Sequence, residues 1–434
     1  MSLSAADRLA QLVRIPTVSR LEDRDEAPFR AFAAALERLY PLVAARLERE
    51  TVGRHAVLYR WAGGAAAPIL LLAHCDVVPA DGGGWSRDPF AGTVADGAVH
   101  GRGALDDKGA VVAILDAIEG LLAEGFTPSG DVLLALGDDE EARGSGARAV
   151  AALLEERGVR PALVLDEGGA VVEGMLPAVR GPIALLGVTE KGVATVRLTV
   201  TGSPGHAATP PPRSAPGRLA RALVRIERHR FPARTTPVVR AMGRALAPRV
   251  PRVLAAVAAG TLAGPALGPL LGIAGGAPAA LVRTTAAVTQ LAGGVAPNVL
   301  AAEASALLNL RIAPGDTVAG AVARLRRLIR DPAVRIEVLA GEDPPPVSRA
   351  DGPAWDRVCA ALASAHPEAL PVPYVMIQAS DSRHFAAGCD AVYRFRPFTI
   401  SAAQLAAIHG VDESLDVAAL ERGVAFHRAL LLHP

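Results

Sequence analysis

Histidine and carboxylate residues that could do chemistry gather in four short segments of the sequence. They are the HCD of residues 74–76, the DD of 106–107, the EE of 140–141 and the LDE of 165–167. Three of the four directly follow apolar runs typical of buried strands. In a doubly wound sheet, ligands bind beyond the carboxyl ends of the strands. We therefore expect these segments to meet at one edge of a sheet.

One histidine and several carboxylates, without thiolate chemistry, form a ligand set for zinc, cobalt or manganese. Two ions about 3.5–4 Å apart need a shared carboxylate and further ligands on each side. Asp106 can bridge two such ions. His74 and Asp166 can complete the site of one ion, and Glu141 with a distant histidine can complete the other.

Glu140 and Glu141 are neighbours, and in an extended segment they point in opposite directions because the side-chain period is two. This favours one ligand and one general base. Asp76, two residues after His74, is placed to accept the other ring N–H of that histidine. Each segment taken singly is more often structural, for example a solvated acidic turn. The four segments together, three of them directly after apolar runs, predict a metal site.

Alternating helix and strand patterns surround these segments. Helices are expected at 5–13, 28–39, 110–123 and 147–156, and strands at 69–73, 132–136 and 162–165. Such alternation predicts the α/β class, with a central mixed, mostly parallel sheet that is covered on both faces.

From residue 188 the pattern changes. GVTEKGVATVRLTV (187–200) alternates with the two-residue period of a half-exposed strand, a helix is expected at 217–228, and strands follow at 286–290 and 304–312. The first pattern returns with helices at 319–330, 354–365 and 417–431 and strands at 334–339 and 392–396. We therefore predict a large domain of residues 1–187 and 314–434 with an inserted α+β domain of 188–313.

The insert contains an uncharged stretch, residues 253–282, within an apolar helical segment of about 243–282. Its length could span a bilayer, but Pro265, Pro269 and Pro278 break it into short pieces. Buried or covering helices are the favoured interpretation, and contact with a membrane surface stays open.

The overall composition limits which partners and which cellular compartment can be expected. The 434 residues include 45 basic and 44 acidic ones, a balance that argues against a nucleic-acid partner. Three cysteines are not a disulfide framework and fit a reducing compartment. The N-terminus reads as an amphipathic helix instead of a signal peptide. We expect a cytoplasmic protein.

A longer series of motifs carries a family resemblance. The chain resembles the dinuclear zinc amidohydrolases and peptidases of the aminoacylase and glutamate-carboxypeptidase superfamily. Within it, the chain is most similar to the carboxypeptidase S branch, which includes the secreted N-fatty-acyl amino acid hydrolases. The motifs cover nearly the whole chain and are HCDVVPA (74–80), WSRDPF (85–90), HGRGALDDKG (100–109), DEEARGSGA (139–147), LDEGG (165–169), EKG (190–192), GHAATPP (205–211), RTTAAVT (283–289), NVLAAEASALLNLRIAPGDT (298–317), DSR (381–383) and IHGVDE (408–413).

This resemblance implies a zinc-peptidase-like catalytic domain with an inserted lid and dimerisation domain. It also implies two Zn²⁺ per chain, for which Co²⁺ or Mn²⁺ can substitute, and a cis peptide between Asp106 and Asp107. Glu140 is the implied general base, and Asp76 orients His74. The implied zinc ligands, with Asp106 bridging, are His74, Asp106, Glu141, Asp166 and His409.

Four further residues are implied to contact the substrate. His206 of the insert donates to the oxyanion, in several relatives across a dimer interface. Asn298 and Arg311 grip the substrate from the lid, and Arg311 can hold a carboxylate by a bidentate fork. Arg383 is a second candidate anchor, although an ion pair with Asp381 explains it as well.

Departures from the family pattern touch details of substrate contact. Cys75 stands where relatives often carry an apolar residue, and core packing is its favoured role. The sequence after the lid histidine reads GHAA instead of GHSS, and the proline of NVIP is absent at residues 298–301.

The function expected is metal-dependent hydrolysis of an amide bond next to a free carboxylate, in an N-acyl amino acid or a dipeptide. The apolar segment favours an apolar acyl or side-chain pocket. One alternative is a deacylase of a small biosynthetic intermediate, of the acetylornithine or succinyl-diaminopimelate type. A non-catalytic metal-binding protein and a dinuclear phosphatase are further alternatives. The expected partners are a small-molecule or peptide substrate and a second copy bound through the lid.

Overall fold

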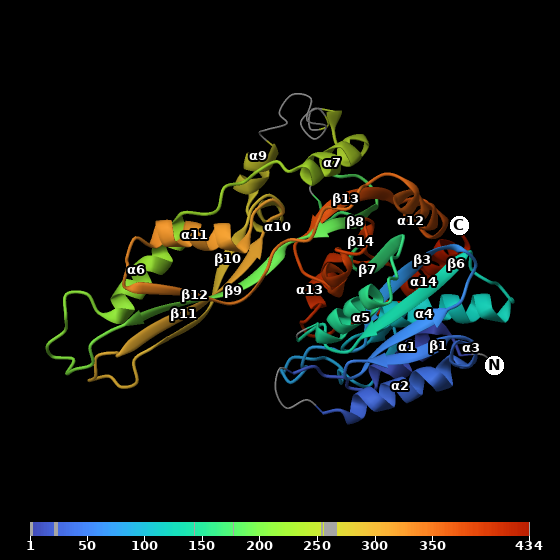
Figure 1. Cartoon of the computed structure of the whole chain (residues 1–434), viewed down its shortest axis with the longest axis horizontal. Helices are drawn as coiled ribbons and strands as arrows, with labels where there is room; N and C mark the ends of the chain where they lie inside the picture. Colours follow the sequence, from blue (N-terminus) through green and yellow to red (C-terminus); the bar gives the residue numbers. More distant parts are fainter. Residues whose placement is uncertain are drawn as a thin grey trace.

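The computed structural model describes residues 3–20, 25–142, 144–176, 178–252, 255 and 267–433. A compact α/β domain holds both termini, and an elongated domain projects from it (Figure 1). The two correspond to the predicted large and inserted domains.

An eight-stranded sheet forms the centre of the large domain. Its order is β1-β2-β6-β3-β7-β14-β8-β13. The central pairs β3–β6, β3–β7 and β7–β14 and the edge pair β8–β13 are parallel, while β1–β2 and β2–β6 are antiparallel. This confirms the mixed, mostly parallel sheet. The strands are β1 (Glu48–Val52), β2 (Ala56–Trp61), β3 (Ala66–His74), β6 (Gly130–Gly137), β7 (Leu163–Val172), β8 (Ile183–Glu190), β13 (Leu370–Met376) and β14 (Val392–Thr399).

Apolar helices cover this sheet. Helix α4 is buried along most of its length, because Ala, Val, Ile and Leu occupy most of its positions. A small sheet of β4 (Thr93–Ala95), β5 (Ala98–His100) and β15 (Ser414–Asp416) belongs to the same domain. The helices of the domain are α1 (Ala5–Val13), α2 (Ala27–Leu39), α3 (Pro41–Arg46), α4 (Lys108–Ala123), α5 (Ser145–Glu156), α12 (Pro353–Ala365), η2 (Asp381–Phe385), α13 (Ala402–Ala407) and α14 (Val417–Leu432).

The lid is built on a four-stranded antiparallel sheet in the order β10-β11-β9-β12. Buried and part-buried residues alternate along β11, as a strand with one covered face requires. The sheet consists of β9 (Gly192–Thr201), β10 (Thr285–Gly293), β11 (Glu303–Ile312) and β12 (Val334–Glu342). Its helices are α6 (Ala215–Arg228), α7 (Pro237–Leu246), η1 (Ala247–Arg249), α9 (Leu267–Ala274), α10 (Gly276–Leu281) and α11 (Val318–Ile329).

The predicted lid boundary at residue 313 is wrong. Strand β12 pairs with β9 from Val334 to Glu342. Leu325 and Ile329 of α11 are buried in the same apolar core as the lid strands. The lid therefore extends to about residue 342. The boundary could not be predicted from the sequence, because a helix followed by a strand has the same pattern whether the strand joins the large sheet or the lid sheet.

The apolar segment is only partly within the described residues. In that part, α9 and α10 are short, and no helix is long and apolar enough to cross a membrane. Helix α7 leans back on the large domain, where Val238 and Leu246 join the main core. Of the predicted segment, residues 253–254 and 256–266 lie outside the described ranges.

Candidate metal centre

Parallel strands bring the predicted chemical residues to one edge of the central sheet. His74 is the last residue of β3, Gly137 ends the neighbouring β6 just before Glu140, and β7 carries Asp166 on the other side of β3. Because β3, β6 and β7 run parallel, their carboxyl ends share one edge. The expectation that the segments meet is confirmed.

Asp106 lies between two groups of potential ligands. Its Oδ1 is 3.2 Å from His74 Nε2, and its Oδ2 is 3.3 Å from His409 Nε2. His409 Nε2 is also 3.0 Å from Glu141 Oε1. His74, Asp106 and Glu141 offer atoms close enough to share one metal ion. The geometry fits a carboxylate that serves two ions, as predicted for Asp106.

The structure places Asp166 outside this cluster. Its Oδ2 accepts the backbone N–H of Ser382 at 2.7 Å, and its Oδ1 accepts that of Glu167 at 2.8 Å. The side chain of Glu167 points the other way, and its Oε1 is 3.9 Å from His74 Nε2. Glu167 also groups with Asp106 as a potential metal ligand. Glu167 thus takes the position predicted for Asp166, the residue just before it in the strand.

Asp76 holds two parts of the site together. The ring Nδ1 of His74 lies 3.0 Å from the backbone oxygen of Asp76 and 3.4 Å from its Oδ1. The same carboxylate accepts the backbone N–H groups of Glu140 and Glu141, both at 3.1 Å. Asp76 therefore orients His74, as predicted, and also positions the segment that carries the predicted base.

Glu413 is a positioning residue that the sequence reasoning missed. Its buried carboxylate accepts the backbone N–H groups of Leu105 at 2.9 Å and Asp106 at 3.0 Å, and it pairs with Arg102 at 2.5 Å. The peptide between Asp106 and Asp107 is cis, as the family resemblance implied. The IHGVDE motif contains Glu413, but nothing in the motif shows which backbone it holds.

Arg396 is the second residue missed. From β14 its Nη2 lies 2.8 Å from Asp106 Oδ1 and contacts Glu167 Oε2, while its Nε is 3.5 Å from Asp107 Oδ1. The residue is only 5% exposed. A fixed positive charge thus lies among the potential ligands on the His74 side of Asp106.

Burial dominates the electrostatics of the cluster. It raises the pKa of Glu140 well above its ordinary value, and it raises that of Asp107 to about 7. For Asp106 the effect of burial is outweighed by Arg396 and by hydrogen bonds from His409 and His74, which hold its pKa well below the usual range. Several carboxylates buried this close together suit a site in which bound cations neutralise their charge. Histidine and carboxylate side chains are also ligands that zinc accepts.

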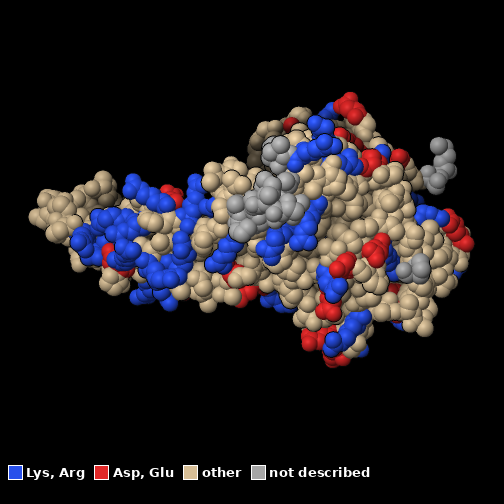
Figure 2. Space-filling model, turned by 90° about the horizontal axis from the view of Figure 1, so that it is seen from above, with Lys and Arg blue, Asp and Glu red and all other residues tan. Residues whose placement is uncertain are grey.

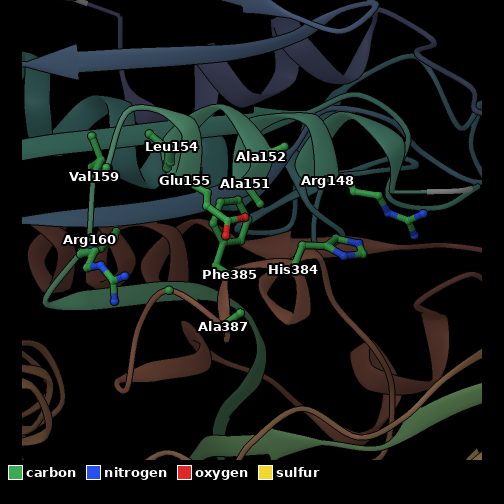
Figure 3. A pocket seen from close by; sticks show the side chains of 13 residues that line it. Arg148, Ala151, Ala152, Leu154, Glu155, Val159, Arg160, His384, Phe385 and Ala387 are labelled. Carbon is green, nitrogen blue, oxygen red and sulfur yellow. The ribbon is translucent and has the colours of Figure 1, made fainter.

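A cavity of about 300 Å³ opens over the cluster. Asp106, Glu140 and His409 line one part, and Met376 and Leu405 add apolar surface. Another cavity, of about 330 Å³, lies between α5 and η2 and is lined by side chains such as Arg148 and His384 (Figure 3). The potential metal ligands do not line this second cavity, so the substrate is expected in the first.

Arg311 lies at the root of the lid, close to the cluster. Burial lowers its pKa, the charge of Arg383 lowers it further, and Glu190 and Glu140 act in the opposite direction. Arg383 donates to the backbone oxygen of Ser380 at 2.6 Å and lies 3.4 Å from Glu190 Oε1. It also lies 3.6 Å from Glu342, so its ion pairs are with Glu190 and Glu342 and not with Asp381, the partner considered as the alternative to substrate anchoring.

His206 and Asn298 lie together at the other end of the lid sheet. His206 forms a bridge with Val299, and the backbone oxygen of Asn298 accepts the N–H of Ala207 at 3.0 Å. Both side chains are exposed. From residue 303 to residue 311, β11 is about 26 Å long at roughly 3.3 Å per residue. The lid therefore keeps this pair away from Arg311 and from the cluster of the same chain.

Comparison with known proteins agrees with this geometry. Residues 70–433 match peptidase family M20/M25/M40. The chain belongs to this family. It is 35% identical to the zebrafish N-fatty-acyl-amino acid synthase/hydrolase PM20D1.1 over 98% of the chain and 84% of that protein. It is 34% identical to human PM20D1, over 97% of the chain and 86% of that protein.

The wider family shares the fold. The chain is 31% identical to the probable carboxypeptidase S-like 2 of Dictyostelium discoideum, over 99% of the chain and 85% of that protein. The M20 metallo-carboxypeptidase Sso-CP2 of Sulfolobus solfataricus superposes with a TM-score of 0.72 at 17% identity, over 98% of this chain and 97% of that one. Human carnosine dipeptidase 1 gives a TM-score of 0.68 at 16% identity, over 99% and 95%. The chain is thus a metal-dependent hydrolase of the M20 fold.

Zinc titration can decide whether Glu167 or Asp166 is the metal ligand. We expect Glu167→Gln to lower the zinc content from two equivalents to one, because a carboxylate that faces His74 is lost. Asp166→Asn should keep two, because Asp166 bonds to backbone N–H groups. Calorimetry and elemental analysis measure both. The opposite result, with one zinc lost only in Asp166→Asn, would make Asp166 the ligand.

Arg396→Gln should tighten zinc binding. Removing a unit positive charge a few ångströms from the cations lowers their repulsion, which we expect to raise zinc affinity roughly tenfold or more. Competition with a chromogenic chelator measures it, and Arg349→Gln on the exposed surface is the matched control. Unchanged or weaker binding by Arg396→Gln would show that the guanidinium does not oppose the metal.

Proposed function

We propose that this hydrolase cleaves the amide bond of N-acyl amino acids with an apolar acyl group, using two zinc ions. The observation that carries this proposal is the position of Arg311. It is a half-buried cation whose charge interacts with Glu140 and Glu190. Its Nε donates to Asn309 Oδ1 at 3.2 Å, and among the described residues it forms no ion pair. A guanidinium so placed suits the free carboxylate of an amino acid.

The acyl preference rests on two further observations. Met376, Leu405 and Ile408 line the cavity beside the acidic cluster. The relatives with over 30% identity include proteins named N-fatty-acyl-amino acid synthase/hydrolases. The runner-up, deacylation of a small polar intermediate, does not need this apolar lining.

Bound zinc would polarise the scissile carbonyl and stabilise the charge that develops on its oxygen. His74, Asp106 and Glu167 would hold one ion, and Asp106, Glu141 and His409 the other. Glu140 lies beside them with a carboxylate made more basic by burial. It takes a proton from the attacking water and gives it to the leaving amine nitrogen. Arg311 would hold the substrate carboxylate and so orient the scissile amide toward Glu140.

The lid geometry supports action across a dimer. His206 and Asn298 are about one strand length from Arg311, too far to reach the acidic cluster of their own chain in this arrangement. We propose that a second copy of the protein supplies them, His206 as a donor to the developing oxyanion.

Glu140→Gln should abolish turnover while leaving the zinc sites filled. Removing the proton acceptor is expected to lower kcat about 10²–10⁴-fold. The assay is amino-acid release from a matched series of acetyl, long-acyl and dipeptidyl substrates. Long-acyl substrates should give the highest kcat/KM in the unmodified enzyme. Preference for dipeptides or acetyl groups would contradict the acyl assignment, and retained activity of Glu140→Gln would contradict the base.

Subunit complementation tests the role of His206 in trans. Glu140→Gln chains and His206→Ala chains are each expected to be inactive. When they are mixed after dissociation, half of the dimers are hybrids, and each hybrid has one site with both residues intact. About a quarter of the unmodified activity should return, as two-fold symmetry requires. No recovery, with hybrids verified by mass, would place His206 in its own chain's site.

A further inference from the structure

Charge is divided very unevenly between the two domains. Residues 192–342, which form the lid, contain 19 arginines, no lysine and 6 acidic residues, a formal net charge of +13. Because the whole chain carries +1, the remaining residues carry −12. The balanced charge of the whole chain therefore conceals a strongly basic lid. Arginines gather over the elongated half of the molecule in Figure 2, with few acidic atoms among them.

Helices α6 and α11 present this basic face. Their apolar sides are buried against the lid sheet. Helix α11 contains no acidic residue, and α6 contains only Glu227. Among the described residues, six exposed arginines on or beside these helices have no ion-pair partner; they are Arg221, Arg228, Arg230, Arg326, Arg327 and Arg330.

Aliphatic side chains are also exposed on helices α9 and α6. Ile273 of α9 is 82% exposed and Leu270 is 53% exposed, while Val224 lies 45% exposed between arginines of α6. Figure 2 looks down on the side where α9 and α11 lie in Figure 1. Arginines next to exposed aliphatic residues are the composition of a surface that rests on anionic lipid, with the cations at the headgroups and the aliphatic groups among the acyl chains.

We propose that the lid docks on an anionic phospholipid bilayer through the face formed by α6, α9 and α11. Single-stranded nucleic acid is a poorer match, because binding proteins stack bases on aromatic side chains. The lid has a single aromatic residue, Phe231, and it is buried. The docking is independent of the hydrolytic reaction proposed above, although it would place an enzyme of apolar substrates beside the phase that holds them.

Vesicle sedimentation tests the proposal. The full-length protein should bind vesicles of phosphatidylcholine with phosphatidylglycerol, bind phosphatidylcholine alone far more weakly, and dissociate at high salt. The triple variant Arg326→Glu/Arg327→Glu/Arg330→Glu should lose roughly 100-fold or more in vesicle affinity, since each basic residue near an anionic surface contributes.

A matched control carries the same change of charge elsewhere. Arg30→Glu/Arg38→Glu/Arg46→Glu reverses three exposed arginines of the large domain, and should bind anionic vesicles within a few-fold of the unmodified protein. If the lid variant misfolds by circular dichroism, Leu270→Ser/Ile273→Ser replaces it and should also weaken binding.

Four results would overturn the proposal. They are absence of binding to anionic vesicles, equal losses in the lid and control variants, and binding to single-stranded or duplex nucleic acid with none to vesicles. The fourth is a change from dimer to monomer in the lid variant, seen by light scattering, because it would show that the basic face covers the acidic domain of a second copy.

Discussion

Buried negative charge is the constraint on which the rest of the site depends. Asp76, Asp106 and Glu167 lie at the edge of the central sheet, and none is more than 7% exposed. Carboxylates at such density are unstable as anions without compensation. The structure compensates them by backbone N–H groups at Asp76, by Arg396, and by histidines placed to share cations with them. We therefore expect bound metal to stabilise this edge of the domain.

The need to hold these buried carboxylates in place also explains the contacts made by residues that are not themselves metal ligands. Glu413 fixes the backbone of Asp106 from one side, and Asp76 fixes the backbone of Glu140 and Glu141 from another. Neither residue needs to touch the substrate. Both determine where the oxygen atoms of the ligands lie, and metal-site and catalytic geometry tolerates little displacement.

Much of this site could be predicted from the sequence, because residue type and position after an apolar run define the chemistry. His74, Asp106, Glu141 and His409 come together as expected. The choice between Asp166 and Glu167 could not be made, because it depends on which face of β7 looks toward His74. The role of Arg396 could not be predicted, because the sequence of a strand does not show whether an arginine in it reaches the metal ligands.

The domain plan shows the same limit. The alternation of β9 and β11 identified the lid, but helix α11 and strand β12 carry no local sign of the sheet that they join. Charge summed over the whole chain conceals opposite charges on the two domains. Local pattern predicts elements, whereas partners in space are decided by pairings between distant segments.

Anomalous diffraction at the zinc edge from crystals of the zinc-loaded protein tests the central claim most directly. We expect two peaks with Asp106 between them, one beside His74 and Glu167 and the other beside Glu141 and His409. A peak coordinated by Asp166, or no peak on the His74 side of Asp106, would contradict this arrangement of ligands.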